Sequence, residues 1–167
     1  MLKHLLALTS LVLMSVGVCA ESNNTPSKWK MVPGTTVDNQ QCVYMHKIAP
    51  LKRAGDVVTT WSSTVRRDDQ LRYITGIGEL KIDCKRKKFK VTSFNNYINT
   101  NFQFNTKIDD PERDVTGVIL NIYDLVCTNK KIDNSLVFEL STVDELVGMG
   151  IAGLKTFEEK FAPDPMK

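Results

Sequence analysis

Two side chains that could support nucleophilic catalysis, Cys42 and His46, stand four residues apart in a stretch rich in apolar residues. The other histidine, His4, belongs to an N-terminal segment that we expect to be removed, so His46 is the one imidazole left to act as a base. In a β-strand this spacing places both side chains on one face but about 13 Å apart. We therefore interpret Cys42 as an ordinary strand cysteine and His46 as a half-exposed histidine, and we predict that the protein is not an enzyme.

The residues that usually bind metals or phosphates do not form a recognisable motif. The sequence has no H-E-x-x-H, EF-hand or C-x-x-C pattern, so we expect no metal ion and no cofactor. We interpret Asp68-Asp69 and Asp109-Asp110 as turn or capping residues. Gly76 and Gly78 lack the following helix of a phosphate loop, and we attribute them to a strand bulge or turn. A secreted hydrolase with two carboxylates stays an alternative, although nothing selects a pair.

The most localised charge feature is the basic run Lys85-Arg86-Lys87-Lys88, which is followed by Lys90. Arg66-Arg67 is expected at a neighbouring strand end. These cations could form a patch for a polyanion or an acidic protein surface, and binding should then weaken with salt. The alternative is a solvated hairpin turn whose lysines protect a sheet edge from aggregation. The net charge of +3 favours no particular partner, and we expect no nucleic-acid ligand.

Residues 1–20 have the features of a secretory signal peptide. Lys3 precedes an apolar stretch that ends at Val18-Cys19-Ala20, and cleavage is expected after Ala20. The stretch is too short for a transmembrane helix, so we expect an exported periplasmic or secreted protein. Cys19 allows the alternative of an outer-membrane lipoprotein, but Val18 is not the small residue that this signal requires.

The mature chain has the size of one domain and begins with a polar leader, residues 21–28, before order starts at Trp29. Apolar residues then recur with a period of two, which predicts strands. The expected strands cover residues 42–48, 57–65, 71–77, 79–84, 89–94 and 97–104. Residues 85–88 are expected to connect the clearest pair.

The apolar period changes to that of a helix after residue 108. Asp109 or Asp110 can cap this helix, with Pro111 and Glu112 in its first turn. Its apolar stripe would contain Val115, Val118, Ile119, Ile122, Leu125 and Val126. The sequence therefore predicts an α+β domain in which a helix covers an antiparallel sheet.

A further strand and helix are expected in the C-terminal extension. Residues 135–140 indicate a short strand, and Thr142-x-x-Glu145 is a capping-box pattern for a last helix. Its apolar face would contain Val143, Leu146, Val147, Gly150, Leu154, Phe157 and Phe161. Gly148, Gly150 and Gly153 each cost about 1 kcal/mol relative to alanine. This helix must therefore be stabilised by tertiary packing or break in two.

Three cysteines remain after cleavage, in a compartment that permits disulfides. Cys84 shares the inward face of its strand with Leu80 and Ile82, because side chains alternate. Cys127 ends the predicted helix that must cover this sheet. We predict a Cys84–Cys127 bridge worth roughly 4 kcal/mol in the chain-entropy model. Pairing with Cys42 is the alternative.

Several segments together resemble the surface-adhesin protein E family. They form a W-x-x-V opening, a V-x-x-W strand, an E-x-x-x-x-C strand and a late helical cysteine, found in residues 29–32, 37–38, 55–61, 79–85 and 124–127. The resemblance covers residues 29–129. It implies an antiparallel sheet with a helix held on its concave face by a strand-to-helix disulfide. Val18, Cys42 and the extension over residues 130–167 depart from the family pattern.

The resemblance also implies a bacterial adhesin-like module that contacts host extracellular-matrix proteins. We therefore expect a binding protein with a protein or polyanionic ligand, and a homodimer is one arrangement it could adopt. The alternatives are a small periplasmic structural or assembly partner and, less favoured, the hydrolase.

Overall fold

The computed structural model describes residues 26–37, 40–128 and 134–161, so the predicted signal peptide and most of the leader lie outside the described residues. The elements in the described part are β1 Ser27–Val37, β2 Gln40–Ala49, β3 Lys52–Ala54, β4 Val57–Arg67, β5 Tyr73–Asp83, β6 Lys88–Ile98, β7 Asn101–Lys107, β8 Arg113–Asp114, α1 Val118–Cys127, β9 Val137–Leu140 and α2 Val143–Phe161.

The strands form one sheet in the order β7-β6-β5-β4-β2-β1-β9, with β3 beside β4 and β8 beside β6. Every pairing is antiparallel. The predicted α+β class is therefore confirmed. β9 pairs with β1, whose first strand residue is Ser27 rather than the expected Trp29. The C-terminal extension thus completes the same sheet.

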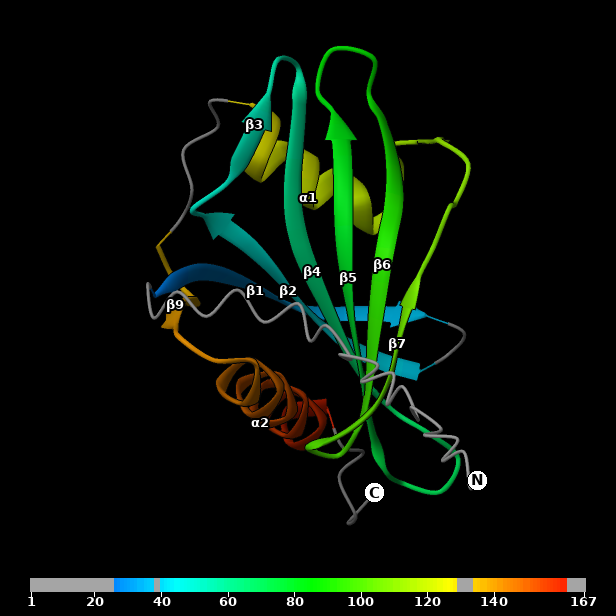
Figure 1. Cartoon of the computed structure of the whole chain (residues 1–167). Helices are drawn as coiled ribbons and strands as arrows, with labels where there is room; N and C mark the ends of the chain where they lie inside the picture. The colour runs from blue at the N-terminus through cyan, green and yellow to red at the C-terminus, as the bar shows by residue number, and fades with distance from the viewer. Residues whose placement is uncertain (1–25, 38–39, 129–133, 162–167) are drawn as a thin grey trace, which may run out of the picture.

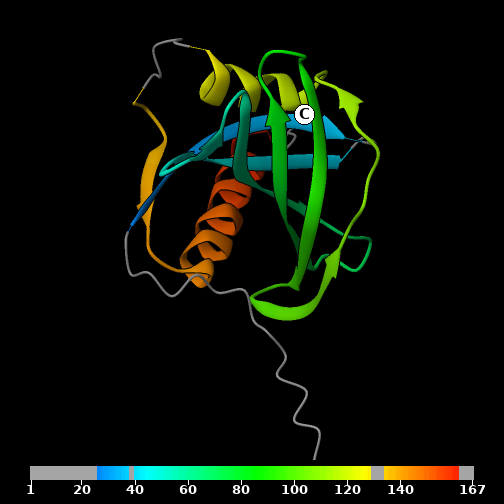
Figure 2. The same cartoon turned by 45° about the horizontal axis from the view of Figure 1, so that its top comes forward.

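The two helices cover opposite faces of this sheet. In β4, Val58 packs in the cluster that contains α1 residues, and Val65 packs in the cluster that contains α2 residues. Seven positions separate these valines, and side chains alternate along a strand, so they point to opposite faces. Figure 1 shows α1 behind one half of β4, β5 and β6, and α2 near the other half; Figure 2 shows the two helices well apart.

β5 is one continuous strand, where the sequence predicted two. Gly76 and Gly78 pair regularly with Thr64 and Ser62 of β4. A Cβ atom on Gly76 would lie 2.5 Å from Cζ of Phe94, so this glycine makes room for an aromatic ring. The expected bulge or turn at these glycines is therefore wrong.

The predicted strand over residues 97–104 is also wrong in its bounds, because it crosses a turn between β6 and β7. Asn99 has a φ of 54°, a left-handed conformation that asparagine tolerates better than most residues. Its backbone N–H donates to the carbonyl of Tyr73 at 2.6 Å, and its side-chain oxygen accepts from the N–H of Tyr73 at 3.2 Å. Asn99 therefore links the turn between β6 and β7 to the first residue of β5.

The helix α1 starts at Val118, well after the predicted start at Asp109 or Asp110. Residues Arg113 and Asp114 pair with β6 instead, and the N–H of Val115 donates to the carbonyl of Lys87 at 3.0 Å. The N-cap is Gly117, with a φ of 56° and no side-chain cap. Residues whose types favour the start of a helix thus form β8 and pair with β6 instead.

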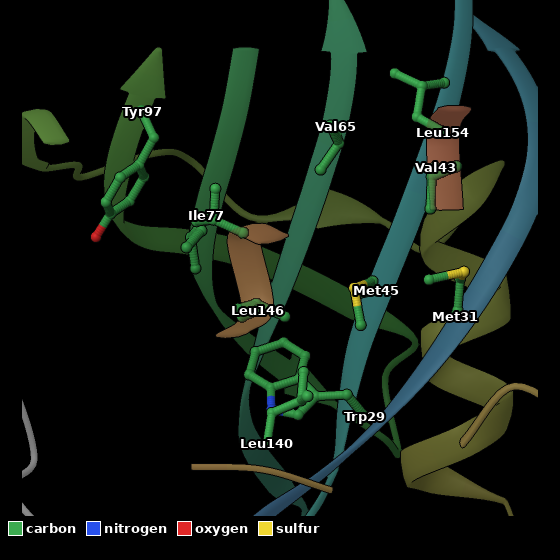
Figure 3. Close-up of a cluster of buried hydrophobic side chains, with 11 residues drawn as sticks. Trp29, Met31, Val43, Met45, Val65, Ile77, Tyr97, Leu140, Leu146 and Leu154 are labelled. Atoms are coloured by element: carbon green, nitrogen blue, oxygen red, sulfur yellow. The ribbon is translucent and has the colours of Figure 1, made fainter. Parts of the chain in front are cut away.

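The predicted capping box at the start of α2 is confirmed. The N–H of Glu145 donates to Oγ1 of Thr142 at 3.1 Å, and Oε2 of Glu145 accepts from the N–H of Thr142 at 3.2 Å. Leu146, Val147 and Leu154 are buried against the sheet, whereas Val143, predicted on the apolar face, is 43% exposed. Figure 3 shows Leu146 and Leu154 among the side chains of the sheet.

Two glycines explain why α2 remains one uninterrupted helix. A Cβ atom on Gly150 would lie 2.5 Å from Cγ2 of Val65, and one on Gly153 would lie 2.7 Å from Cε of Met31. These glycines let the helix backbone approach the sheet closely. The packing that results offsets their low helix propensity.

Candidate anion-binding face

The predicted disulfide between Cys84 and Cys127 is confirmed. It joins the end of β5 to the last residue of α1, with 5.3 Å between the Cα atoms. The hydroxyl of Tyr123 donates to the carbonyl of Cys84 at 3.0 Å, next to the bridge. Cys42 is a thiol that is 1% exposed. The alternative bridges that involve Cys42 are therefore excluded.

The basic hairpin turn, residues 84–87, is organised by Asp83. One carboxylate oxygen of Asp83 accepts from the backbone N–H groups of Lys85 and Arg86 at 3.1 and 2.8 Å. The other accepts from Nε of Arg86 at 2.7 Å. Hydrogen bonds from the backbone and then the side chain of Arg86 lower the pKa of Asp83 below its usual value.

Arg86 also binds Glu112 in a bidentate pair, with Nη1 and Nη2 at 2.9 and 2.8 Å from the carboxylate oxygens. These hydrogen bonds lower the pKa of Glu112. Lys88 pairs with Asp114 at 2.7 Å. Two of the four cations in the run therefore hold local acids, which connects the hairpin to the segment before α1.

The remaining residues of the predicted patch near the hairpin are Lys85, Lys87 and Lys90. Lys85 and Lys87 are exposed, and neither forms an ion pair with another described residue. Lys90 lies in β6 and helps to lower the pKa of Glu112 through its charge. These three lysines remain available to an external anion.

Arg66 and Arg67 lie at the opposite end of β4 from this hairpin, so the prediction that they lie near it is wrong. In the β4–β5 register Val57 is opposite Asp83, whereas Arg67 is opposite Tyr73. The eleven residues of β4 separate these ends by about 30 Å. This separation follows from the antiparallel register between β4 and β5, which could not be predicted from the sequence.

Arg67 belongs to a separate surface hollow of about 370 Å³ that α2 helps to line. Its Nη2 donates to the Tyr73 hydroxyl at 2.7 Å, and its Nε lies 2.9 Å from Glu158. Lys155 lies 5.5 Å from the centre of the Tyr73 ring. Glu159 lines the same hollow, so the two cations there face two acids.

The sheet itself forms a row of lysines that the sequence analysis missed. Lys81 of β5 lies directly opposite Lys90 of β6, and Thr59 of β4 lies opposite Lys81 on its other side. Lys52 of β3 lies opposite Thr59. We call Lys52, Thr59, Lys81 and Lys90 the lysine row. It runs across four neighbouring strands on one face.

The lysine row lies on the face of the sheet that α1 leaves open. Leu80 and Ile82 pack with α1, so Lys81 between them points to the other face. Lys52 and Lys81 are exposed, and Lys90 is partly exposed. In Figure 1 this half of β4, β5 and β6 has α1 behind it and no helix in front of it.

Two acids of β5, Glu79 and Asp83, and one aromatic residue flank the row on the same face, and Asp83 is held by Arg86. Glu79 lies two positions from Lys81 along β5, and its carboxylate accepts from the hydroxyl of Thr92 at 3.0 Å. Trp61 lies opposite Glu79 and is half-buried against the core that includes α2. Like charges directly opposite one another destabilise a strand pair, so Lys81 and Lys90 favour an anion between them.

His46 is fully buried, which corrects the expectation of a half-exposed histidine. Its Nδ1 lies 2.9 Å from Oγ of Ser62 on β4, and burial lowers its pKa to about 4. The imidazole is therefore neutral near pH 7. His46 itself has no exposed surface, whereas Ser62 is partly exposed.

Two other classes of site, metal-binding clusters and membrane-spanning helices, are absent from the part of the chain that the structure describes. Within these residues, no group of three or more histidine, cysteine or acidic side chains is placed to hold a metal ion. No helix in the same ranges is both long and apolar enough to span a membrane.

Comparisons with known proteins found no match among family models, curated proteins or solved structures. The residues of the lysine row and of the hairpin are therefore the basis for a functional proposal.

Proposed function

We propose that this protein is an exported, non-enzymatic binding module that holds an anionic ligand on the face formed by the lysine row and the hairpin. The observation that carries the proposal is the directly opposed pair Lys81 and Lys90 on an open sheet face. The exposed Lys85 and Lys87 extend the positive charge toward the turn. An anion bound between these lysines would relieve their mutual repulsion.

The ion pairs of the hairpin support this role. Arg86 and Lys88 are held by Asp83, Glu112 and Asp114. These contacts fix the backbone from which Lys85, Lys87 and Lys90 project, which reduces the ordering cost of binding. The resemblance to the surface-adhesin protein E family suggests an acidic or polyanionic component of a host extracellular matrix as the biological ligand.

The proposal is tested by binding of the full exported protein to a sulfated polysaccharide at low and moderate salt. Lys81→Gln with Lys90→Gln should weaken binding about fivefold to tenfold at low salt and reduce its salt dependence. The matched control is Lys155→Gln with Lys160→Gln, which removes the same charge from exposed positions of α2. Equal loss in both variants, with folding intact, would indicate a general charge effect and refute the site.

A further inference from the structure

The lysine row also specifies the shape of the ligand, given the proposed anion-binding function. Neighbouring strands lie about 4.8 Å apart, so the row spans about 14 Å from β3 to β6. Lys81 and Lys90 occupy adjacent strands, whereas Lys52 is separated from Lys81 by Thr59. A compact anion can be reached by the Lys81 and Lys90 pair alone. Only an extended ligand with repeated charges can contact all three lysines.

The two ends of the row differ. The β6–β8 register pairs Phe89 with Arg113, so the residue before Arg113, Glu112, follows on the side of Lys90. At the other end is Lys52 on β3, which pairs with β4 and has no further strand of the described sheet on its outer side. The Lys90 end of the row is therefore bordered by the Arg86–Glu112 ion pair, whereas the Lys52 end is an edge of the described sheet.

The side chains along the row favour a sugar polymer over other polyanions. Lysine ammonium groups are point charges that pair with sulfate, carboxylate or phosphate, so charge alone does not select the polymer. The Thr59 hydroxyl between them can exchange hydrogen bonds with sugar hydroxyls. Single-stranded nucleic acids instead require exposed aromatic rings for base stacking. Trp61, next along β4 on this face, is half-buried and packed against the core.

An acidic protein surface is a poorer match. Protein interfaces of standard size have an apolar centre. The large hydrophobic residues that are exposed in the described part all lie outside strands β3 to β6, which carry the row. They are Leu71, Phe102, Phe104, Leu120, Leu136 and Val143.

We infer that the ligand is a linear sulfated or carboxylated polysaccharide that lies across strands β3 to β6 along the lysine row. This inference rests on the proposed function and adds the class and direction of the ligand. Sulfate and carboxylate groups present the same negative charge to lysine, so polymers of each kind are separate arms of the test.

The test measures binding of defined oligosaccharides to the full exported protein by calorimetry. Four ligands are compared: a sulfated disaccharide, a sulfated hexasaccharide, a carboxylated hexasaccharide, and a single-stranded DNA with the same charge as the sulfated hexasaccharide. The hexasaccharides should bind at least several-fold more tightly than the disaccharide and the DNA. Lys52→Gln should weaken hexasaccharide binding several-fold and leave disaccharide binding unchanged, because the disaccharide can reach only Lys81 and Lys90.

Thr59→Val provides a second, nearly isosteric variant that keeps every charge. It should weaken binding of the hexasaccharides and leave DNA binding unchanged. If DNA binds as tightly as the hexasaccharides, or if Lys52→Gln affects both sugar lengths equally, the polysaccharide inference is wrong while anion binding stands. Failure of every polyanion to bind at low salt would refute the proposed function itself.

Discussion

Gly150 of α2 lies so close to Val65 of β4 that there is no room for even one additional methyl group between them. Gly148, two residues earlier in the same helix, has open space where its Cβ would be. The two glycines therefore have opposite physical roles in one helix. The first permits a close packing contact, and the second costs helix propensity without any contact in return.

Gly150→Ala should destabilise the protein by about 1–3 kcal/mol, because the added methyl must displace the side chain of Val65. Gly148→Ala should stabilise it by about 0.5–1 kcal/mol through helix propensity. Gly153→Ala should cost less than Gly150→Ala, since its nearest contact is the flexible thioether of Met31. Urea unfolding monitored by circular dichroism gives all three values. If Gly148→Ala were the most destabilising of the three, close contact with the sheet would not be what sets these values.

Stability should depend on pH through His46. Its pKa is about 4 in the folded protein and 6.5 as a reference, so between these values the unfolded chain binds more protons. The free energy of unfolding should then fall by about 1.4 kcal/mol per pH unit as the pH decreases below 6.5, for a total of roughly 3 kcal/mol by pH 4. Urea unfolding across this range measures the slope.

His46→Gln should flatten that slope between pH 6.5 and 5, whatever its effect on stability at neutral pH. The acids with lowered pKa values, Asp68, Asp83 and Glu112, act at lower pH and leave this window unaffected. A slope that persists unchanged in His46→Gln would show that another group is responsible.

Removing the disulfide should cost roughly 4 kcal/mol, because the bridge closes a separation of 43 residues. Cys84→Ser with Cys127→Ser should lower the unfolding midpoint strongly and loosen α1. Hydrogen exchange should show faster exchange at Ile122 and Val126, which are buried on the α1 side. The amide groups of α2 serve as the internal control, since that helix packs on the opposite face. Equal acceleration in both helices would contradict local tethering.

The bidentate contact between Arg86 and Glu112 should be visible in the titration of Glu112. In Arg86→Gln the pKa of Glu112 should rise toward its usual value, since hydrogen bonds from Arg86 are the largest cause that lowers it. Carbon-detected NMR of the side-chain carboxyl measures the shift. Lys88→Gln is the control, because Lys88 pairs with Asp114. No change in Arg86→Gln would mean that the pair does not persist in solution.

Local sequence signals predicted much of this structure. The capping box of Thr142 and Glu145 and the inward position of Cys84 depend on residues a few positions apart, and both were confirmed. The start of α1 was predicted wrongly because residues with good capping chemistry pair with β6, a contact that no local pattern contains. The turn at Asn99 was missed because a single asparagine is a weak turn signal.

The lysine row could not be predicted because it depends on the register of three strand pairs. The expected connection over residues 85–88 is displaced by one residue from the turn over residues 84–87. A displacement of this size changes which side chains face one another across a hairpin. For the same reason, Arg66 and Arg67 are predicted near the basic turn, although they lie at the far end of β4.

The coverage of the sheet by one helix on each face has a consequence for misfolding. Strands β4 and β5 each bury one set of alternating side chains in one half and the opposite set in the other half, as Val58 and Val65 illustrate. A slip of one residue along such a strand would turn both sets out to solvent together. Any slip by an odd number of residues therefore exposes the buried side chains of both halves, so these registers compete poorly with the native one.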